Sequence, residues 1–334
     1  MNVYILKRLL LLIPTTIGIT LVCFFLMQLL PGGPVEELIM KVQSSASAKG
    51  ISSQISIEQL DQIKAYYGYD QPPFMRYVSW MKNVLCLDLG RSSSYEMPAW
   101  DVIVSKMPIS AFFGLSSLIL SYLICVPLGV WKAKNNGKIS DLISSIVVFA
   151  GYVIPSYALG ILCVVFFAGG TFFDWFPLGG IVSDDFESLD FLGQIYDFSY
   201  HMILPLFCFM AGELAFLTLL VKNGVLDELK KDYVRTATLK GASESRVLWR
   251  HALVNALVPL ATRAGEIFTV MFAGSLLLEK VFDIDGMGLL YYNAMISRDY
   301  NVVLGIIVIS SFLALLGRLF ADLLVAWIDP RVQY

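Results

Sequence analysis

Six long apolar stretches constrain this chain more than any other feature. Each is close to the roughly 20 residues that an α-helix needs to cross the hydrocarbon core of a bilayer. They are Leu9–Leu30, Ile109–Trp131, Leu142–Ala168, Met202–Val221, Leu257–Leu278 and Val302–Trp327. Only 15% of the 334 residues are charged, against roughly 25% in a soluble domain, so most of the exterior must face lipid. The sequence therefore predicts an all-α membrane protein with about six transmembrane helices.

The first apolar stretch is an anchor rather than a signal peptide. Lys7 and Arg8 precede it, as they would in a signal peptide, but the apolar run is too long for a signal-peptide core. No small-x-small cleavage site follows, and the residues Pro31-Gly32-Gly33-Pro34 end the run instead. We therefore expect an N-terminal transmembrane helix over residues 1–30.

The distribution of charge predicts the orientation of the spans. With a cytoplasmic N-terminus, the inside segments hold 13 Lys and Arg against 6 Asp and Glu, and the outside segments hold 9 against 18. The inside is then +7 and the outside −9. Cytoplasmic loops of membrane proteins carry the excess of Lys and Arg. We therefore expect both termini in the cytoplasm.

The outside segment 31–108 is too long for a simple connector. Within it, apolar residues follow the spacing of a one-sided helix; they are Phe74, Tyr77, Val78, Met81, Val84 and Leu85. Such a helix can lie on the outer membrane surface or cover the mouth of a pathway. A small extracytoplasmic subdomain that packs on itself explains the pattern equally well. The remaining residues, 109–334, form the predicted five-helix core.

The inside segment 222–256 is polar and helix-prone. Gly241 is placed to end one helix, because glycine tolerates a left-handed conformation. Ser243 can cap the next helix, with Glu244 in its first turn. The segment is therefore predicted to form a helix, a sharp turn and a second helix outside the membrane.

The chain has no sequence motif for an energy source or an enzyme. Gly137-Lys138 is followed by Ile139, and no glycine stands five residues before Gly137, so it is not a phosphate-binding loop. No G-x-S-x-G motif is present, and His201 and His251 are far apart without a cysteine partner, so neither a catalytic residue nor a metal site is expected. Energy must then come from an ion gradient or from a partner protein.

Charged residues inside the spans are the candidates for a polar pathway, because an ionised group there is costly and usually faces protein or water. Arg263 and Glu266 are three residues apart and can form a pair on one helix face. Glu213 has no partner close in sequence. These residues line a translocation pathway in one interpretation and form structural salt bridges in the other. Prolines can kink the spans that contain them; they are Pro14, Pro127, Pro155, Pro205 and Pro259.

Residues Asp232–Leu253 closely resemble the cytoplasmic coupling loop, or EAA loop, of ABC importer permeases in its peptide-permease form. Arg235 and Thr236 stand where the general pattern has Glu and Ala, as is usual in peptide permeases. The resemblance implies that a short helix docks in a groove of an ATP-binding subunit. Tyr233, Ala237 and Gly241 share one face at this spacing, with Arg235 and Lys240 off it. The residues expected to couple are Asp232, Tyr233, Arg235, Ala237, Lys240 and Gly241.

The resemblance to ABC permeases of the dipeptide/oligopeptide importer family covers essentially the whole chain. Details such as Phe173–Leu178 and Gly274–Leu277 look most like the branch that imports microcin C and oligopeptides. Motifs that match the family are Pro31–Pro34, Tyr67–Pro72, Asp88–Gly90, His201–Pro205, Val281-Phe282, Gly286–Gly288, Arg298–Tyr300 and Asp329–Arg331.

The resemblance implies a type I ABC importer permease fold and a bacterial inner-membrane location. It implies a heterodimer with a second homologous permease, ATP-binding subunits that hold ATP and Mg, and an extracytoplasmic substrate-binding protein. This chain itself is expected to carry no cofactor, to be surrounded by lipid and to bind no nucleic acid. The alternative function is a secondary transporter driven by a proton gradient, with Glu213 as the proton carrier.

Overall fold

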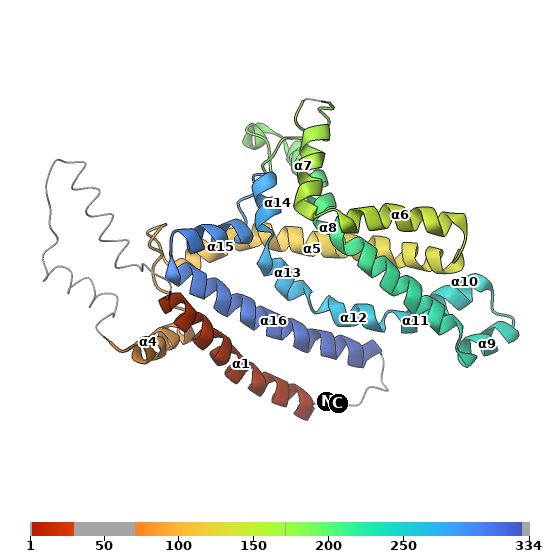
Figure 1. The fold of residues 1–334 in the computed structure, drawn as a ribbon, viewed down its shortest axis with the longest axis horizontal. Coiled ribbons are helices and arrows are strands. Elements are labelled where there is room, and N and C mark those ends of the chain that lie inside the picture. The colour runs from red at the N-terminus through yellow and green to blue at the C-terminus, as the bar shows by residue number, and fades with distance from the viewer. Residues whose placement is uncertain (1, 30–70, 171, 329–334) are drawn as a thin grey trace, which may run out of the picture. The chain divides into compact units, whose positions relative to one another are not determined.

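The computed structural model describes residues 2–29, 71–170 and 172–328, drawn as coloured ribbons in Figure 1. The chain divides into two compact units. Unit 1 comprises Met1–Tyr4, Pro108–Leu289 and Leu313–Tyr334, and unit 2 comprises Ile5–Met107 and Leu290–Phe312. The longer helices are α1 (Asn2–Leu29), α4 (Pro73–Leu85), α5 (Ala99–Lys134), α6 (Ile139–Val153), α7 (Ser156–Phe167), α8 (Phe191–Leu229), α15 (Met287–Ile296) and α16 (Tyr300–Ile328). The shorter ones are η1 (Phe186–Ser188), α9 (Asp232–Leu239), α10 (Glu244–Arg246), the π-helix η2 (Val247–Ala252), α11 (Leu253–Ala256), α12 (Val258–Ala264), α13 (Ile267–Ala273) and α14 (Leu276–Val281).

The number of candidate membrane spans agrees with the sequence. Among the described residues, α1, α5, α8 and α16 are each long and apolar enough to cross a membrane. Two bent helix pairs pass the same test when each pair is taken as one span, which gives up to six. These pairs are α6 with α7, and Glu244–Ala256 with Val258–Phe272. The predicted all-α architecture of about six spans is therefore confirmed.

The predicted span Leu142–Ala168 is broken at its middle, next to Pro155, one of the prolines expected to kink a span. Helices α6 and α7 meet at an angle of 100° (Figure 1). Ile154 stands between them with extended backbone angles, φ −77° and ψ 122°. It precedes Pro155, and the proline ring disfavours a helical conformation in the residue before it. Other prolines have a smaller effect, because α1, α5 and α8 each continue through theirs.

The predicted span Leu257–Leu278 is likewise discontinuous. It comprises α12, α13 and the start of α14, preceded by a bend of 48° after Ala256. Gly265 follows the end of α12, and Gly274 separates α13 from α14 with a left-handed φ of +59°. Pro259 lies in the first turn of α12, where its missing N–H group costs no helical hydrogen bond.

Two other spans extend further than their apolar cores. Helix α5 begins at Ala99 rather than Ile109, so the predicted boundary between residues 108 and 109 falls inside a helix. Helix α8 begins at Phe191, where the Asp190 carboxylate accepts a hydrogen bond from the Gly193 amide at 3.0 Å. A search for apolar stretches identifies only the part of a helix that suits the lipid. It cannot identify polar turns by which the helix continues beyond the lipid.

Unit 1 contains two apolar clusters. One joins α5 and α8 to η2, α11 and α12 through the buried residues Cys125, Val130, Ala133, Leu217, Val221, Val225, Leu248, Ala252, Leu253, Ala256 and Leu260. The other joins α5, α7, α8 and α14 through Phe113, Cys163, Ala168, Met202, Leu204, Cys208, Leu278, Phe282 and Ile284. Helix α8 contributes to both clusters and is the central element of this unit.

In unit 2, the predicted amphipathic helix is α4, and it packs on α1. The hydroxyl of Tyr77 lies 3.0 Å from the Thr20 hydroxyl, and its ring lies edge-on to Phe24 with centroids 5.5 Å apart. Phe74 and Leu85, at the two ends of the predicted apolar face, are exposed. The described part of segment 31–108 therefore contains the predicted helix, which packs on α1; both alternatives for the role of the segment remain predictions. Residues 31–70 of that segment lie outside the described residues, as do the motifs Pro31–Pro34 and Asp329–Arg331 and most of Tyr67–Pro72.

The backbones of α12 and α16 lie in close contact where Gly265 faces Gly317. A Cβ atom at Gly265 would lie 2.2 Å from the Gly317 carbonyl oxygen, and one at Gly317 would lie 2.1 Å from the Gly265 carbonyl oxygen. Gly265→Ala should therefore lower the free energy of unfolding by about 1–3 kcal/mol, as overpacking does. The matched control is Gly212→Ala in α8, where a Cβ has nothing within 4 Å. Thermal unfolding in detergent should show a loss for the first variant only; equal melting temperatures would contradict this packing.

Candidate functional site

The 222–256 segment forms the predicted helix, turn and helix. Residues 222–229 continue α8, and α9 follows after a break at Lys231. Gly241 has a φ of +86°, which is the left-handed conformation expected at the end of α9. The Ser243 hydroxyl accepts a hydrogen bond from the Arg246 amide at 3.4 Å and so caps α10. Both local predictions, the glycine stop and the serine cap, are confirmed.

One side of α9 is attached to the rest of the segment. Val234 is buried, and Ala237 is half-buried. The Tyr233 hydroxyl donates a hydrogen bond to the buried Glu228 carboxylate and accepts one from the Asn255 amide at 2.7 Å. Burial, followed by the hydrogen bond to Glu228, raises the pKa of Tyr233 above that of a free tyrosine. The hydroxyl therefore stays protonated near neutral pH and remains a donor.

The opposite side of α9 faces outward. Asp232, Arg235 and Lys240 are exposed, and Leu239 is 80% exposed. Sequence reasoning placed the contact face on Tyr233, Ala237 and Gly241, but in the structure the Tyr233 hydroxyl and Ala237 face this chain's own helices. The sequence analysis did not single out Leu239. The pattern that could have identified it is a single large apolar residue in an otherwise polar segment. The coupling role of all these residues remains a prediction.

The three candidate pathway residues form one polar cluster in unit 1. Nη2 of Arg263 in α12 lies 2.7 Å from the Glu266 carboxylate and 4.0 Å from the Glu213 carboxylate of α8. The guanidinium carbon also lies 4.9 Å from the centroid of the Phe216 ring. The sequence predicted the local Arg263–Glu266 pair, and the structure adds Glu213, which had no partner close in sequence. Two carboxylates thus share one guanidinium.

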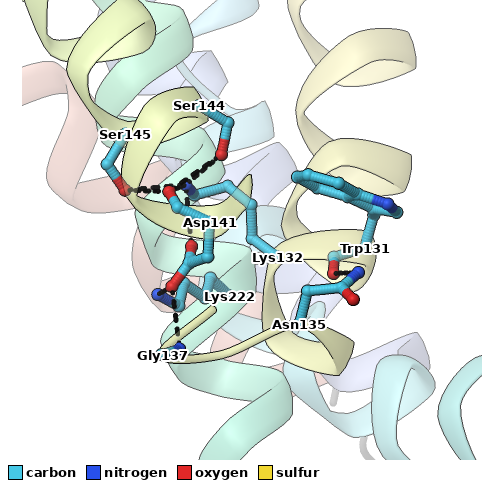
Figure 2. Close-up of polar contacts among 8 residues, drawn as sticks. All are labelled: Trp131, Lys132, Asn135, Gly137, Asp141, Ser144, Ser145 and Lys222. Atoms are coloured by element: carbon cyan, nitrogen blue, oxygen red, sulfur yellow. Dashed lines mark hydrogen bonds and ion pairs between the residues drawn. The ribbon is translucent and has the colours of Figure 1, made fainter. Parts of the chain in front are cut away.

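A second charged cluster was not predicted, and it joins α5, α6 and α8 (Figure 2). Lys132 Nζ lies 2.9 Å from one oxygen of Asp141, and Lys222 Nζ lies 2.7 Å from the other. Lys132 also donates to the Asp141 carbonyl and to the hydroxyls of Ser144 and Ser145. The side chains of Lys132 and Asp141 are only 1% and 8% exposed. A buried charge needs this degree of pairing and hydrogen bonding to be tolerated.

Among the described residues, no group of three or more His, Cys, Asp or Glu side chains is placed to hold a metal ion. The ionic clusters described above instead pair carboxylates with Lys and Arg.

Comparison with known proteins identifies the family. Residues 125–334 match the family described as binding-protein-dependent transport system inner membrane component. The chain is 38% identical to the peptidoglycan transport system permease protein YejB of Agrobacterium fabrum, across 100% of this chain and 99% of that protein. It is 36% identical to the inner membrane ABC transporter permease protein YejB of Escherichia coli O157:H7, with the same coverage. It is 33% identical to the oligopeptide transport system permease protein AppB of Bacillus subtilis, across all of both chains.

The chain therefore belongs to the inner-membrane components of binding-protein-dependent transport systems. Within that class it is an ABC transporter permease of the dipeptide/oligopeptide importer family, as the whole-chain resemblance predicted. It is a multi-pass inner-membrane protein and a transport component, like its relatives. A secondary transporter driven by a proton gradient, the alternative suggested by the sequence, does not fit this family.

The cluster around Asp141 should stabilise the fold, because Asp141 is the counter-ion of the buried Lys132. Asp141→Asn leaves Lys132 buried without a counter-ion, so it should lower the free energy of unfolding by about 3 kcal/mol or more. Asp227→Asn is the matched control, because Asp227 and its partner Lys230 are 72% and 75% exposed. That change should alter stability by less than about 0.5 kcal/mol. Thermal unfolding of both variants in detergent measures the difference, and similar small losses would show that the cluster is not a stabilising feature.

Proposed function

We propose that the chain is one of two transmembrane subunits of an ATP-driven importer that carries oligopeptides, microcin C-like peptides among them, across the bacterial inner membrane. The observation that carries this proposal is the 222–256 segment. It is a polar helical elbow, attached on one side through Tyr233 and Glu228 and exposed on the other. The chain's own sequence contains no phosphate-binding loop, so a separate ATP-binding subunit must supply the energy.

The outward side of α9 is suited to docking on such a subunit. Leu239 offers an exposed apolar contact, and Arg235 and Lys240 offer charged groups around it. Apolar anchors surrounded by polar groups are typical of protein interfaces. The inward contacts of Tyr233 would transmit a displacement of α9 to the end of α8. Asp232, Tyr233, Arg235, Ala237, Lys240 and Gly241 remain the residues proposed to couple, with Leu239 added.

The orientation of the chain follows from its charge. The segments on the side of the elbow carry a net +7, and those on the other side a net −9. Because positive loops stay in the cytoplasm, the elbow and both termini belong on the cytoplasmic side, where ATP is available. The acidic outer side is then available to an extracytoplasmic substrate-binding protein.

The remaining partners are proposed on the strength of the family. They are a second homologous permease that forms a heterodimer with this chain, and ATP-binding subunits that hold ATP and Mg. The relatives are named for transport of peptidoglycan, oligopeptides and dipeptides, and these names support a peptide cargo. Glu213, Arg263 and Glu266 are proposed to line the pathway of that cargo.

Charge reversal on the outward side of α9 tests the proposal. Arg235→Glu should reduce ATP-dependent peptide uptake roughly tenfold and weaken co-elution of the ATP-binding subunit, because it opposes an interface charge. Arg235 is exposed and has no ion pair among the described residues, so folding should be unaffected. It is a cleaner probe than Gly241, where any side chain would strain the left-handed backbone.

The matched control is Lys138→Glu, a charge reversal at an exposed position in the turn between α5 and α6. It should leave co-elution and uptake close to wild type. Full uptake and full co-elution in Arg235→Glu would count against α9 as the contact with the ATP-binding subunit.

A further inference from the structure

A cavity of about 220 Å³ lies within unit 1, between α5, α7, α8 and α13. Its polar lining includes Ser117 and Ser121 of α5, Ser156 of α7 and Glu213 of α8. Its apolar wall includes Phe113 and Phe209, whose rings stack with centroids 5.2 Å apart. The cavity has room for several water molecules or one amino-acid residue.

The hydroxyl groups of this lining remain available as hydrogen-bond acceptors. Ser117 and Ser121 are four residues apart and therefore lie on the same face of α5. Ser117 donates its hydrogen to the Gly114 carbonyl at 3.0 Å, which leaves its oxygen free to accept. The hydroxyls of Ser121 and Ser156 have no hydrogen bond to another residue in the described ranges.

The charge around the cavity is negative. Arg263 lies closer to Glu266, at 2.7 Å, than to Glu213, at 4.0 Å. One guanidinium cannot neutralise two carboxylates, and Glu213 is the one that lines the cavity. A cation of suitable size would therefore be attracted to this position.

Glu279 adds to this field from behind the lining. It is 1% exposed, and Ser110, which lines the cavity, donates to it at 3.4 Å. Its carboxylate accepts hydrogen bonds from the amides of Ser275 and Leu289 at 3.1 and 2.7 Å. Because those amides satisfy its oxygens, Glu279 contributes charge without being available to a ligand.

We infer that this cavity is a binding site for a primary ammonium group, specifically the N-terminal ammonium of a peptide in transit. An ammonium donates three hydrogen bonds, and the cavity offers one carboxylate and neighbouring hydroxyl oxygens as acceptors. The free N-terminal ammonium is the cation that linear peptides share whatever their sequence, so such a site would serve many cargoes. The inference rests on the proposed peptide import.

Uptake by the complete importer, reconstituted in liposomes with its binding protein, tests the inference. Two tripeptides of the same sequence are compared, one with a free N-terminus and one N-acetylated, and the uptake ratio is measured for each variant. The binding protein's own preference enters the wild-type and variant ratios equally and so cancels between them. Glu213→Gln should lower the ratio of free to acetylated peptide about tenfold, the size of one charge-assisted hydrogen bond.

The matched control is Asp227→Asn, which removes an exposed carboxylate of the same helix away from the cavity and should leave the ratio unchanged. Ser121→Ala provides a second, uncharged variant that should lower the ratio about threefold. It also serves if Glu213→Gln fails to assemble with its partners. An unchanged ratio in both cavity variants would overturn the inference.

Two further outcomes would also overturn it. Equal losses for both peptides in Glu213→Gln, together with uptake that collapses with the proton gradient, would identify Glu213 as a proton carrier. A wild-type complex that moves neither peptide when supplied with ATP would remove the peptide-import proposal itself. The two failures are distinguishable. If the wild-type complex imports peptide and the ratio of free to acetylated peptide is unchanged in the cavity variants, only the ammonium site is refuted.

Discussion

The hydrocarbon core of a bilayer has no water to hydrogen-bond a backbone amide, so segments that cross it must satisfy their amides within helices. This constraint explains why the chain is so rich in long apolar helices and why its irregular points matter. Such irregular backbone is tolerated where a neighbouring helix covers it, as at the break after α12. At Gly265, for example, the backbone of α16 at Gly317 approaches so closely that even a methyl group would not fit. The backbone at this break is therefore covered by α16, whereas Val153 and Pro155 at the break between α6 and α7 are exposed.

Helix α8 connects the features on which the proposed function depends. Glu213 lies in its middle, Lys222 pairs with Asp141 further along, and Glu228 binds Tyr233 near its end. The Lys132–Asp141–Lys222 cluster also ties α8 to α5 and α6. A movement of α9 would thus be carried by a helix that is fixed to its neighbours through charged contacts. Such contacts are costly to break, so they hold α8 firmly against α5 and α6.

On the proposed function, the polar cluster and the cavity would allow a permissive pathway to recognise its cargo. Arg263 reduces the repulsion between the Glu213 and Glu266 carboxylates, but its single positive charge cannot neutralise both negative charges. The charge that remains faces a cavity lined by hydroxyl groups, whose hydrogen bonds can turn toward ligands of different shape. An importer of varied peptides needs contacts to groups that all peptides share, and such a lining would supply them without selecting side chains.

The sequence by itself determined the features that depend on neighbouring residues along the chain. Hydropathy fixed the number of spans, Gly241 and Ser243 fixed the turn after α9, and spacing fixed the Arg263–Glu266 pair. Only the tertiary structure decided which side of α9 faces outward, that Glu213 joins Arg263, and that Asp141 lies between two lysines. These outcomes depend on how each helix is rotated about its axis and on what packs against it. Local periodicity describes one helix at a time and carries no information about the helix beside it.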